Sequence, residues 1–106
     1  MPRTSVISGS FSQNDQPARG WVRFTPSRLW VVQEGVAWAS LAPETPLDYD
    51  GSFTVQVTST DSDPINWFYY ICTPAGCYQC HVPYNVAGWS LRELISEHRS
   101  RARAPH

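Results

Sequence analysis

The most regular alternation of apolar and polar positions in the chain lies in residues 47–57. Phe53, Val55 and Val57 share one face of the predicted strand, and the polar residues between them share the other. The Asp-Gly pair at 50–51 supplies the positive φ of a tight turn just before this strand. Because a single strand cannot bury its apolar face, the stretch predicts a second layer of strands packed against it.

Turn signals divide the rest of the chain into further short strands. Asn14-Asp15 and Glu34-Gly35 are typical of turns, and Pro43 and Pro46 keep the chain extended near a sheet edge. Additional strands are predicted at residues 6–11, 21–25, 29–33, 36–41, 66–72 and 77–83. The pattern therefore predicts a mainly β fold: a single antiparallel β-sandwich with about seven short strands, of immunoglobulin-like or transthyretin-like kind.

A short helix is predicted near the C-terminus, over residues 90–98. Ser90 and Glu93 have the spacing of a capping box. The apolar stripe of this helix consists of Leu91, Leu94 and Ile95. We expect residues 1–98 to form one domain and residues 99–106 to form a basic flexible tail, because the tail has little to bury.

Composition narrows the classes of function. The formal net charge is −1, so the chain has no overall attraction to nucleic acid, and nucleic acid is not an expected partner. It lacks a long apolar run and a basic-then-apolar leading segment, so we expect neither a membrane partner nor export. Five Trp, five Tyr and four Phe exceed what one small core needs, which favours a role for aromatic rings at an interface.

The segment 66–72 is apolar on both faces. Trp67 and Tyr69 lie on one side of the predicted strand, and Phe68 and Tyr70 on the other. One side can enter the core, while the other needs cover from another segment or another chain. The candidate interface residues, including the helix stripe and the basic tail, are Trp67, Phe68, Tyr69, Tyr70, Trp89, Leu91, Leu94, Ile95, Arg99, Arg101 and Arg103.

The three cysteines lie close together in the sequence. Cys77 to His81 matches the C-x-x-C-H motif of haem attachment, but a strand places Cys77 and Cys80 on opposite faces, which argues against haem. A zinc site is disfavoured because the side chains of Cys80 and His81 point apart. A four-residue loop at 73–76 would place Cys72 opposite Cys77, so these two are the candidate disulfide, with buried free thiols as the alternative.

No arrangement of residues indicates catalysis. His81, His98 and His106 lie near no nucleophile motif, and the chain has no glycine-rich phosphate loop. We therefore expect a protein that is not an enzyme and that has no cofactor or bound metal.

In the order of its segments the chain resembles small virion proteins and fibre modules from phages of actinobacteria, and more distantly the transthyretin-like modules attached to carboxypeptidases and adhesins. The residues that carry the resemblance are Val6 to Gly9, Gln16 to Ser27, Leu47 to Val55, Thr60-Asp61, Asn66 to Tyr70, Val82-Pro83 and Ser90 to Leu94. The chain departs from this family in the cysteine-rich hairpin from Cys72 to His81, where such modules carry polar or charged residues.

The resemblance implies a non-catalytic structural protein of the virion, assembled in the cytoplasm of the bacterial host. Tail tip, fibre or collar is the expected location, and decoration of the capsid is an alternative. The implied partners are other virion proteins and copies of the chain itself, as in a homo-oligomer such as a trimer. A second hypothesis, based on the Trp and Tyr residues, is a carbohydrate-binding module that adheres to a host-surface glycan.

Overall fold

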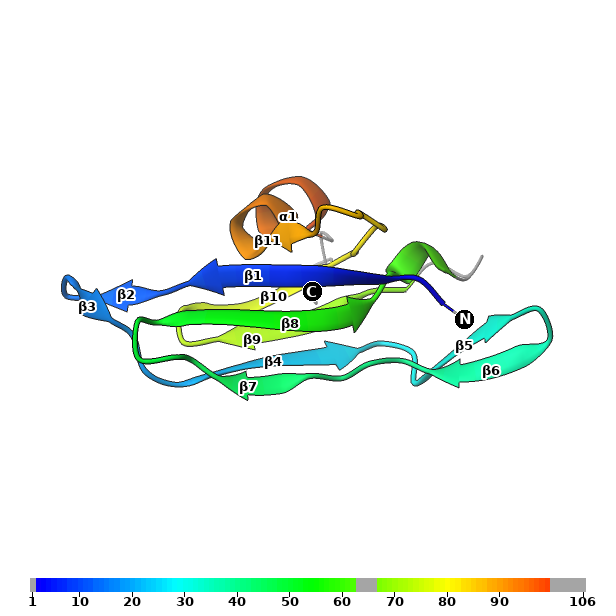
Figure 1. The fold of residues 1–106 in the computed structure, drawn as a ribbon, viewed down its shortest axis with the longest axis horizontal. Coiled ribbons are helices and arrows are strands. Elements are labelled where there is room, and N and C mark those ends of the chain that lie inside the picture. The colour runs from blue at the N-terminus through cyan, green and yellow to red at the C-terminus, as the bar shows by residue number, and fades with distance from the viewer. Residues whose placement is uncertain (1, 63–66, 100–106) are drawn as a thin grey trace, which may run out of the picture.

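The computed structural model describes residues 2–62 and 67–99 and has a mainly β fold with one short C-terminal helix (Figure 1). The elements are β1 (Thr4–Ser10), β2 (Ser12–Gln13), β3 (Gln16–Pro17), β4 (Trp21–Pro26), β5 (Trp30–Gln33), β6 (Val36–Ala39), β7 (Glu44–Pro46), β8 (Ser52–Thr58), the 3-10 turn η1 (Thr60–Ser62), β9 (Tyr69–Thr73), β10 (Gly76–Cys80), β11 (Trp89–Ser90) and α1 (Leu91–His98).

Two larger sheets form the body of the molecule, and two small hairpins extend from it. One sheet has the strand order β11-β1-β8 and the other has the order β10-β9-β4-β7. The strands of each sheet are antiparallel except for β1 and β11, which are parallel. Figure 1 shows the β2–β3 hairpin at one end of the long axis and the β5–β6 hairpin at the other.

Apolar side chains from both larger sheets share one core. The predicted alternation in β8 is confirmed, because Phe53, Val55 and Val57 are buried while the polar residues between them are exposed. From the other sheet, Phe24 of β4 meets Phe53 with 6.3 Å between ring centroids. The helix α1 buries Leu91 and Leu94 in the same core.

The helix begins as the sequence predicts. The backbone N–H of Glu93 donates to Ser90 Oγ at 3.1 Å, and the backbone N–H of Ser90 donates to Glu93 Oε1 at 3.3 Å, which together form a capping box. This pair satisfies two backbone donors at the helix start. The helix ends at His98, and it contacts β1 and β10, an inner and an edge strand of the two larger sheets.

Both small hairpins have two-residue turns in which both residues have positive φ. The values are 52° and 61° for Asn14 and Asp15, and 54° and 75° for Glu34 and Gly35. Such turns match the right-handed twist of the flanking strands, so each pair of strands can be joined by only two residues. The sequence predicts a turn at each of these two pairs, and both turns are confirmed.

The arrangement differs from the sequence-based expectation in several places: β2, β3 and β11 were not predicted as strands, and the strand predicted at 77–83 ends at Cys80. The strands predicted at 29–33 and 36–41 pair with each other as a separate two-stranded sheet. β7 pairs with β4 at the sheet edge, where Pro43 and Pro46 were expected to lie, but it was not predicted as a strand. The predicted strand 66–72 begins at Tyr69, and residue 66 lies outside the described residues.

A glycine substitution tests the turn before β8. Gly51 has φ of 81°, and a Cβ there would collide with the carbonyl oxygen of Phe11. Gly35 has a similar φ of 75°, but nothing lies within 4 Å of its would-be Cβ. We expect Gly35→Ala to lower the free energy of unfolding by about 1 kcal/mol and Gly51→Ala to lower it by at least about 3 kcal/mol. Equal losses in urea unfolding of the two variants would contradict the steric argument.

Candidate interaction surfaces

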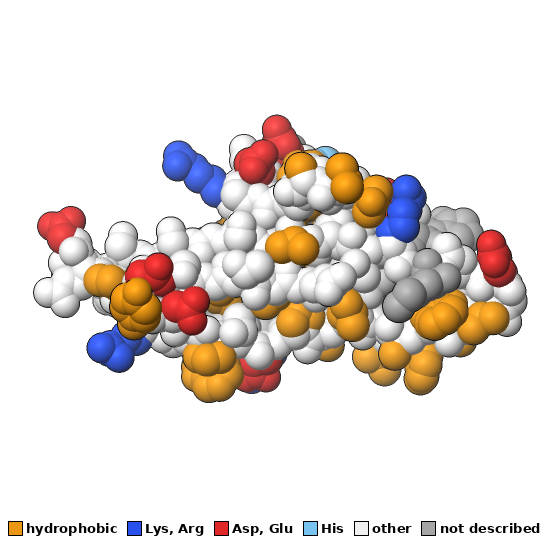
Figure 2. All heavy atoms as spheres, in the orientation of Figure 1, with side chains coloured by type: hydrophobic (Ala, Val, Ile, Leu, Met, Phe, Trp, Pro, Cys, Tyr) orange, Lys and Arg blue, Asp and Glu red, His pale blue; other side chains and the backbone are white. Residues whose placement is uncertain are grey.

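Several exposed apolar side chains lie together on the β5–β6 hairpin. Its register pairs Trp30 with Ala39 and Val32 with Ala37, and all four side chains are exposed on one face. Trp30 and Val32 are 56% and 49% exposed. Figure 2 shows the apolar side chains gathered over this end of the molecule. A contiguous apolar surface of this kind is typical of a contact with another molecule.

The opposite face of the hairpin holds it to the body. Val31 is fully buried, and its cross-strand partner Trp38 is half-buried. At the base, the backbone N–H of Ser40 donates to the carbonyl of Leu29 at 2.9 Å. The Ser40 hydroxyl donates to the carbonyl of Arg28 at 2.6 Å. Burial of Val31 therefore anchors one face of the hairpin near its base, although Val36 near the turn is 49% exposed on that face, and the other face is open.

A buried polar cluster fixes where the hairpin leaves the core. The hydroxyl of Tyr69 donates to the Leu41 carbonyl at 2.7 Å and accepts from the Thr58 backbone N–H at 3.1 Å. The Leu41 N–H in turn donates to the Thr58 hydroxyl at 3.0 Å. These bonds satisfy buried polar groups that would otherwise destabilise the core, and burial raises the pKa of Tyr69 to about 12.

A second surface is the outer face of the four-stranded sheet. Trp21 of β4 is 58% exposed. Beside it, the Arg23 guanidinium forms an ion pair with Glu44 at 3.1 Å. Trp21 and Arg23 line a shallow pocket that also includes Arg19 and Pro74. An exposed ring beside charged groups can stack on a flat ligand and hydrogen-bond to its edge.

The prediction of an interface position is wrong for four residues, because these residues lie in the core. Trp67, Tyr69, Leu91 and Leu94 are between 0% and 4% exposed. The segment 66–72 is apolar on both sides, and its alternation alone does not identify the inner side. Only the folded core, in which Trp67 and Tyr69 are buried together with side chains from β8 and α1, identifies this side as the inner one.

Phe68 and Tyr70 lie on the other side of the same segment, where Phe68 is half-buried and Tyr70 is exposed. Their rings meet edge to face at 5.1 Å, so this side retains an aromatic pair at the surface.

The remaining predicted interface residues lie near the helix. Trp89 is half-buried, and its Nε1 donates to the Pro83 carbonyl at 2.8 Å. Ile95 is half-buried against the core. Arg99 is exposed, with its guanidinium 5.5 Å from the Tyr78 ring centre. Arg101 and Arg103 lie outside the described residues.

The hairpin residues are the ones that sequence reasoning missed. Neither Trp30 nor Val32 was predicted at the interface, because both strands were assigned to the body of the sandwich. The available signal was a continuous apolar strand at 29–33 facing an alanine-rich strand across a two-residue turn. Such a hairpin has two apolar faces and can bury only one of them.

The candidate disulfide joins neighbouring strands in the structure. Cys72 and Cys77 lie directly opposite each other in β9 and β10, with Cα atoms 4.1 Å apart, and their sulfur atoms are bonded. This Cα separation is typical of a non-hydrogen-bonded antiparallel pair. The loop is shorter than predicted, since Thr73 pairs with Gly76 around a two-residue turn.

Cys80 lies on the other face of β10 and is fully buried as a free thiol. His81 points its Nδ1 at the Trp67 carbonyl, at 2.8 Å. Among residues 2–62 and 67–99, no three His, Cys, Asp or Glu side chains are grouped as metal ligands would be. Two of the cysteines, Cys72 and Cys77, therefore form a cross-strand disulfide, and the third, Cys80, packs in the core.

Comparison with known proteins leaves the chain unassigned: no family model matches it, and no curated protein matches it. In the described part of the chain, the helix is too short and too polar to cross a membrane.

The buried thiol predicts a pH dependence of stability. Burial raises the pKa of Cys80 from its ordinary value of 9.0 to about 11, although the charge of Arg99 opposes this. As the pH rises through 9, the thiol ionises in the unfolded chain while it stays protonated in the folded one. The free energy of unfolding should thus fall between pH 9 and about 11. The chain has no lysine to titrate in this range.

The Cys80→Ala variant isolates this effect. We expect it to lose on the order of 1 kcal/mol at neutral pH through the cavity it leaves. Its stability should then decline less steeply between pH 9 and 10, below the range in which Tyr69 contributes. Urea unfolding at a series of pH values measures how steeply the free energy of unfolding falls with pH in the wild-type chain and in Cys80→Ala. Equal slopes in the two proteins would refute the assignment of this pH dependence to Cys80.

Proposed function

We propose that this chain is a non-catalytic structural component of a phage virion, at the tail tip, fibre or collar. It works by contacts with copies of itself and with other virion proteins. The observation that supports this proposal best is the open apolar face of the β5–β6 hairpin. The setting in a virion rests on the sequence resemblance alone, and decoration of a capsid would use the same kind of contact.

The size of the apolar face favours association. Burying one large apolar side chain stabilises an interface by about 1.5–3 kcal/mol, which corresponds to at least a tenfold change in affinity. The hairpin exposes Trp30, Val32 and the flanking Leu29, whose side chain is 72% exposed. Association would bury several of these side chains together, whereas a monomer leaves all of them in water.

Two exposed tryptophans allow a matched test of association. Trp30 on the hairpin and Trp21 on the sheet are exposed to nearly the same extent, 56% and 58%. We expect size-exclusion chromatography with light scattering to give an oligomer for the wild-type chain at micromolar concentration. Trp30→Gln should shift it to smaller species, and Trp21→Gln should leave it unchanged. A monomeric wild-type chain, or equal effects of the two variants, would contradict the proposal.

A second candidate function, adhesion to a host-surface glycan, is favoured by the Trp21 surface. Its exposed ring and the Arg23–Glu44 ion pair combine a stacking face with hydrogen-bonding groups, as sugars require.

If this surface binds sugar, fragments of host cell-wall glycan should change the tryptophan fluorescence of the wild-type chain. The change should be lost in Trp21→Ala and kept in Trp30→Ala. No change in the wild-type chain, or a change that survives in Trp21→Ala, would exclude this surface as the glycan site.

A further inference from the structure

The two ends of the molecule carry different surfaces. The β5–β6 hairpin, which bears the open apolar face, lies at one end of the long axis in Figure 1. Toward the other end, an apolar groove lies between the end of β1 and the start of α1. The molecule extends 49 Å along this axis, so the anchored hairpin cannot reach the groove of its own chain.

The groove combines an apolar wall with an open strand edge. Phe11, Leu91 and Ile95 supply its apolar wall. β11 pairs with β1 only at Ile7 and Ser8, so among the described residues no strand pairs with Gly9 and Ser10 on this side. An unpaired strand edge beside apolar side chains is a typical place for a strand of another molecule to bind.

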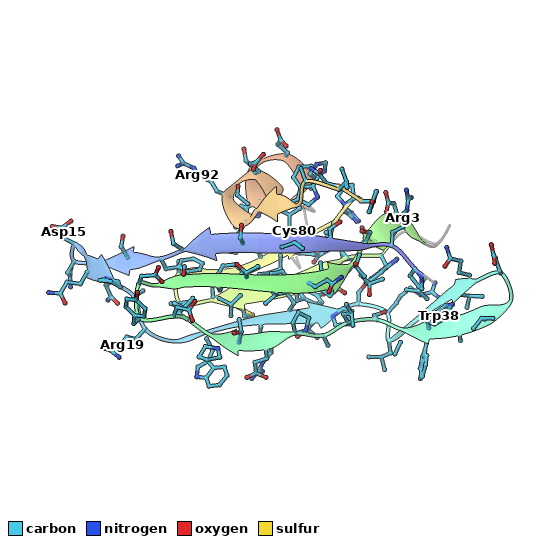
Figure 3. The ribbon with its side chains drawn as sticks, in the orientation of Figure 1. Arg3, Asp15, Arg19, Trp38, Cys80 and Arg92 are labelled. Atoms are coloured by element: carbon cyan, nitrogen blue, oxygen red, sulfur yellow. A yellow bond between two sulfur atoms is a disulfide. The ribbon has the colours of Figure 1, made fainter. Side chains whose placement is uncertain are left out.

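One positive charge stands at this groove. Arg92 of α1 is exposed and lines the groove, and Figure 3 shows it pointing from the helix toward the β2–β3 end of the molecule. No ion pair is found for it within the part of the chain that the structure describes.

The hairpin has the matching features. Its open face is apolar, and in the described part of the chain β6 pairs only with β5, which leaves its outer edge open. Glu34 stands at the exposed tip of the turn, and no ion pair with it is found in the residues described. It is the only charged residue from position 29 to position 43. The hairpin thus has an apolar surface, an open strand edge and a single negative charge. These features complement the apolar wall, the open strand edge and the positive charge of the groove.

We propose that the hairpin of one copy docks in the groove between β1 and α1 of the next copy, with Glu34 facing Arg92. This inference rests on the proposed function and specifies its self-contact. Such a contact joins two different surfaces, so it is heterologous and generates rings when the rotation closes and filaments when it does not. A contact between two hairpins would instead be symmetric and would stop at a dimer.

Mixing two defective variants tests this geometry. Trp30→Gln impairs the hairpin and leaves the groove intact, while the double variant Arg92→Glu, Ser96→Glu impairs the groove and leaves the hairpin intact. We expect each variant alone to associate at least tenfold more weakly than the wild-type chain. Mixed together, they should form a one-to-one dimer that does not grow, because only one intact hairpin and one intact groove remain.

The outcomes separate the two proposals. A wild-type chain that is monomeric overturns both the self-assembly and its geometry. A wild-type oligomer that persists unchanged in the groove variant overturns the head-to-tail contact and leaves the proposed function standing. Circular dichroism and urea unfolding of each variant exclude loss of folding as the cause.

Charge reversal supplies a control at a matched position. Glu34→Arg and Arg92→Glu should each weaken association about tenfold, and the chain carrying both should recover most of it. Asp15→Arg changes the net charge of the chain as much as Glu34→Arg does. Asp15 also stands in a positive-φ turn, with φ of 61° against 54° for Glu34. This control should associate like the wild-type chain, and a loss as large as that of Glu34→Arg would overturn the specific pairing.

Discussion

The hydroxyl of Tyr69 is the point on which the arrangement of this molecule depends. It lies inside the core and bonds to the backbone of both Leu41 and Thr58, while the Thr58 hydroxyl bonds back to Leu41. These residues belong to three separate segments: the exit from the β5–β6 hairpin, the end of β8 and the start of β9. A buried hydroxyl must be satisfied, so these segments are held in one geometry.

That geometry determines which apolar residues reach water. The chain returns from β6 to the body at Leu41, where the Tyr69 hydroxyl holds it, and β5 and β6 extend beyond the two larger sheets (Figure 1). On one face of the hairpin, Val31 is buried against the body. On the other face, the described residues leave Trp30 56% exposed. The exposed apolar face is therefore a consequence of where the core ends, which is why we regard it as the basis of function.

The cysteines show the same division between an inner and an outer face. Successive side chains of a strand point to opposite faces, so Cys77 of β10 lies outside, bonded to Cys72, and Cys80 lies inside, where burial raises its pKa. The motif that resembles haem attachment thus places its two thiols on opposite sides of one strand. Cys77 and Cys80, which match a cofactor motif in the sequence, have separate structural roles in the fold: Cys77 forms the disulfide and Cys80 packs in the core.

The sequence by itself determined the mainly β class, the alternation of β8, the turn at Glu34-Gly35 and the capping box of α1. Each of these follows from residues that are near neighbours in the chain, because strand alternation, turn conformation and helix capping are local properties. The opposition of Cys72 and Cys77 was predictable for the same reason, since both belong to one hairpin.

Only the tertiary structure decided which apolar side chains are surplus to the core. Trp67 and Trp30 are equivalent as residues, yet the first is enclosed between the sheets and the second stands in water. Burial depends on which distant segments pack over a face, and the parallel pairing of β11 with β1 joins residues about eighty positions apart. Local pattern carries no information on such contacts, so the surface that we propose for assembly emerges only when the whole chain has folded.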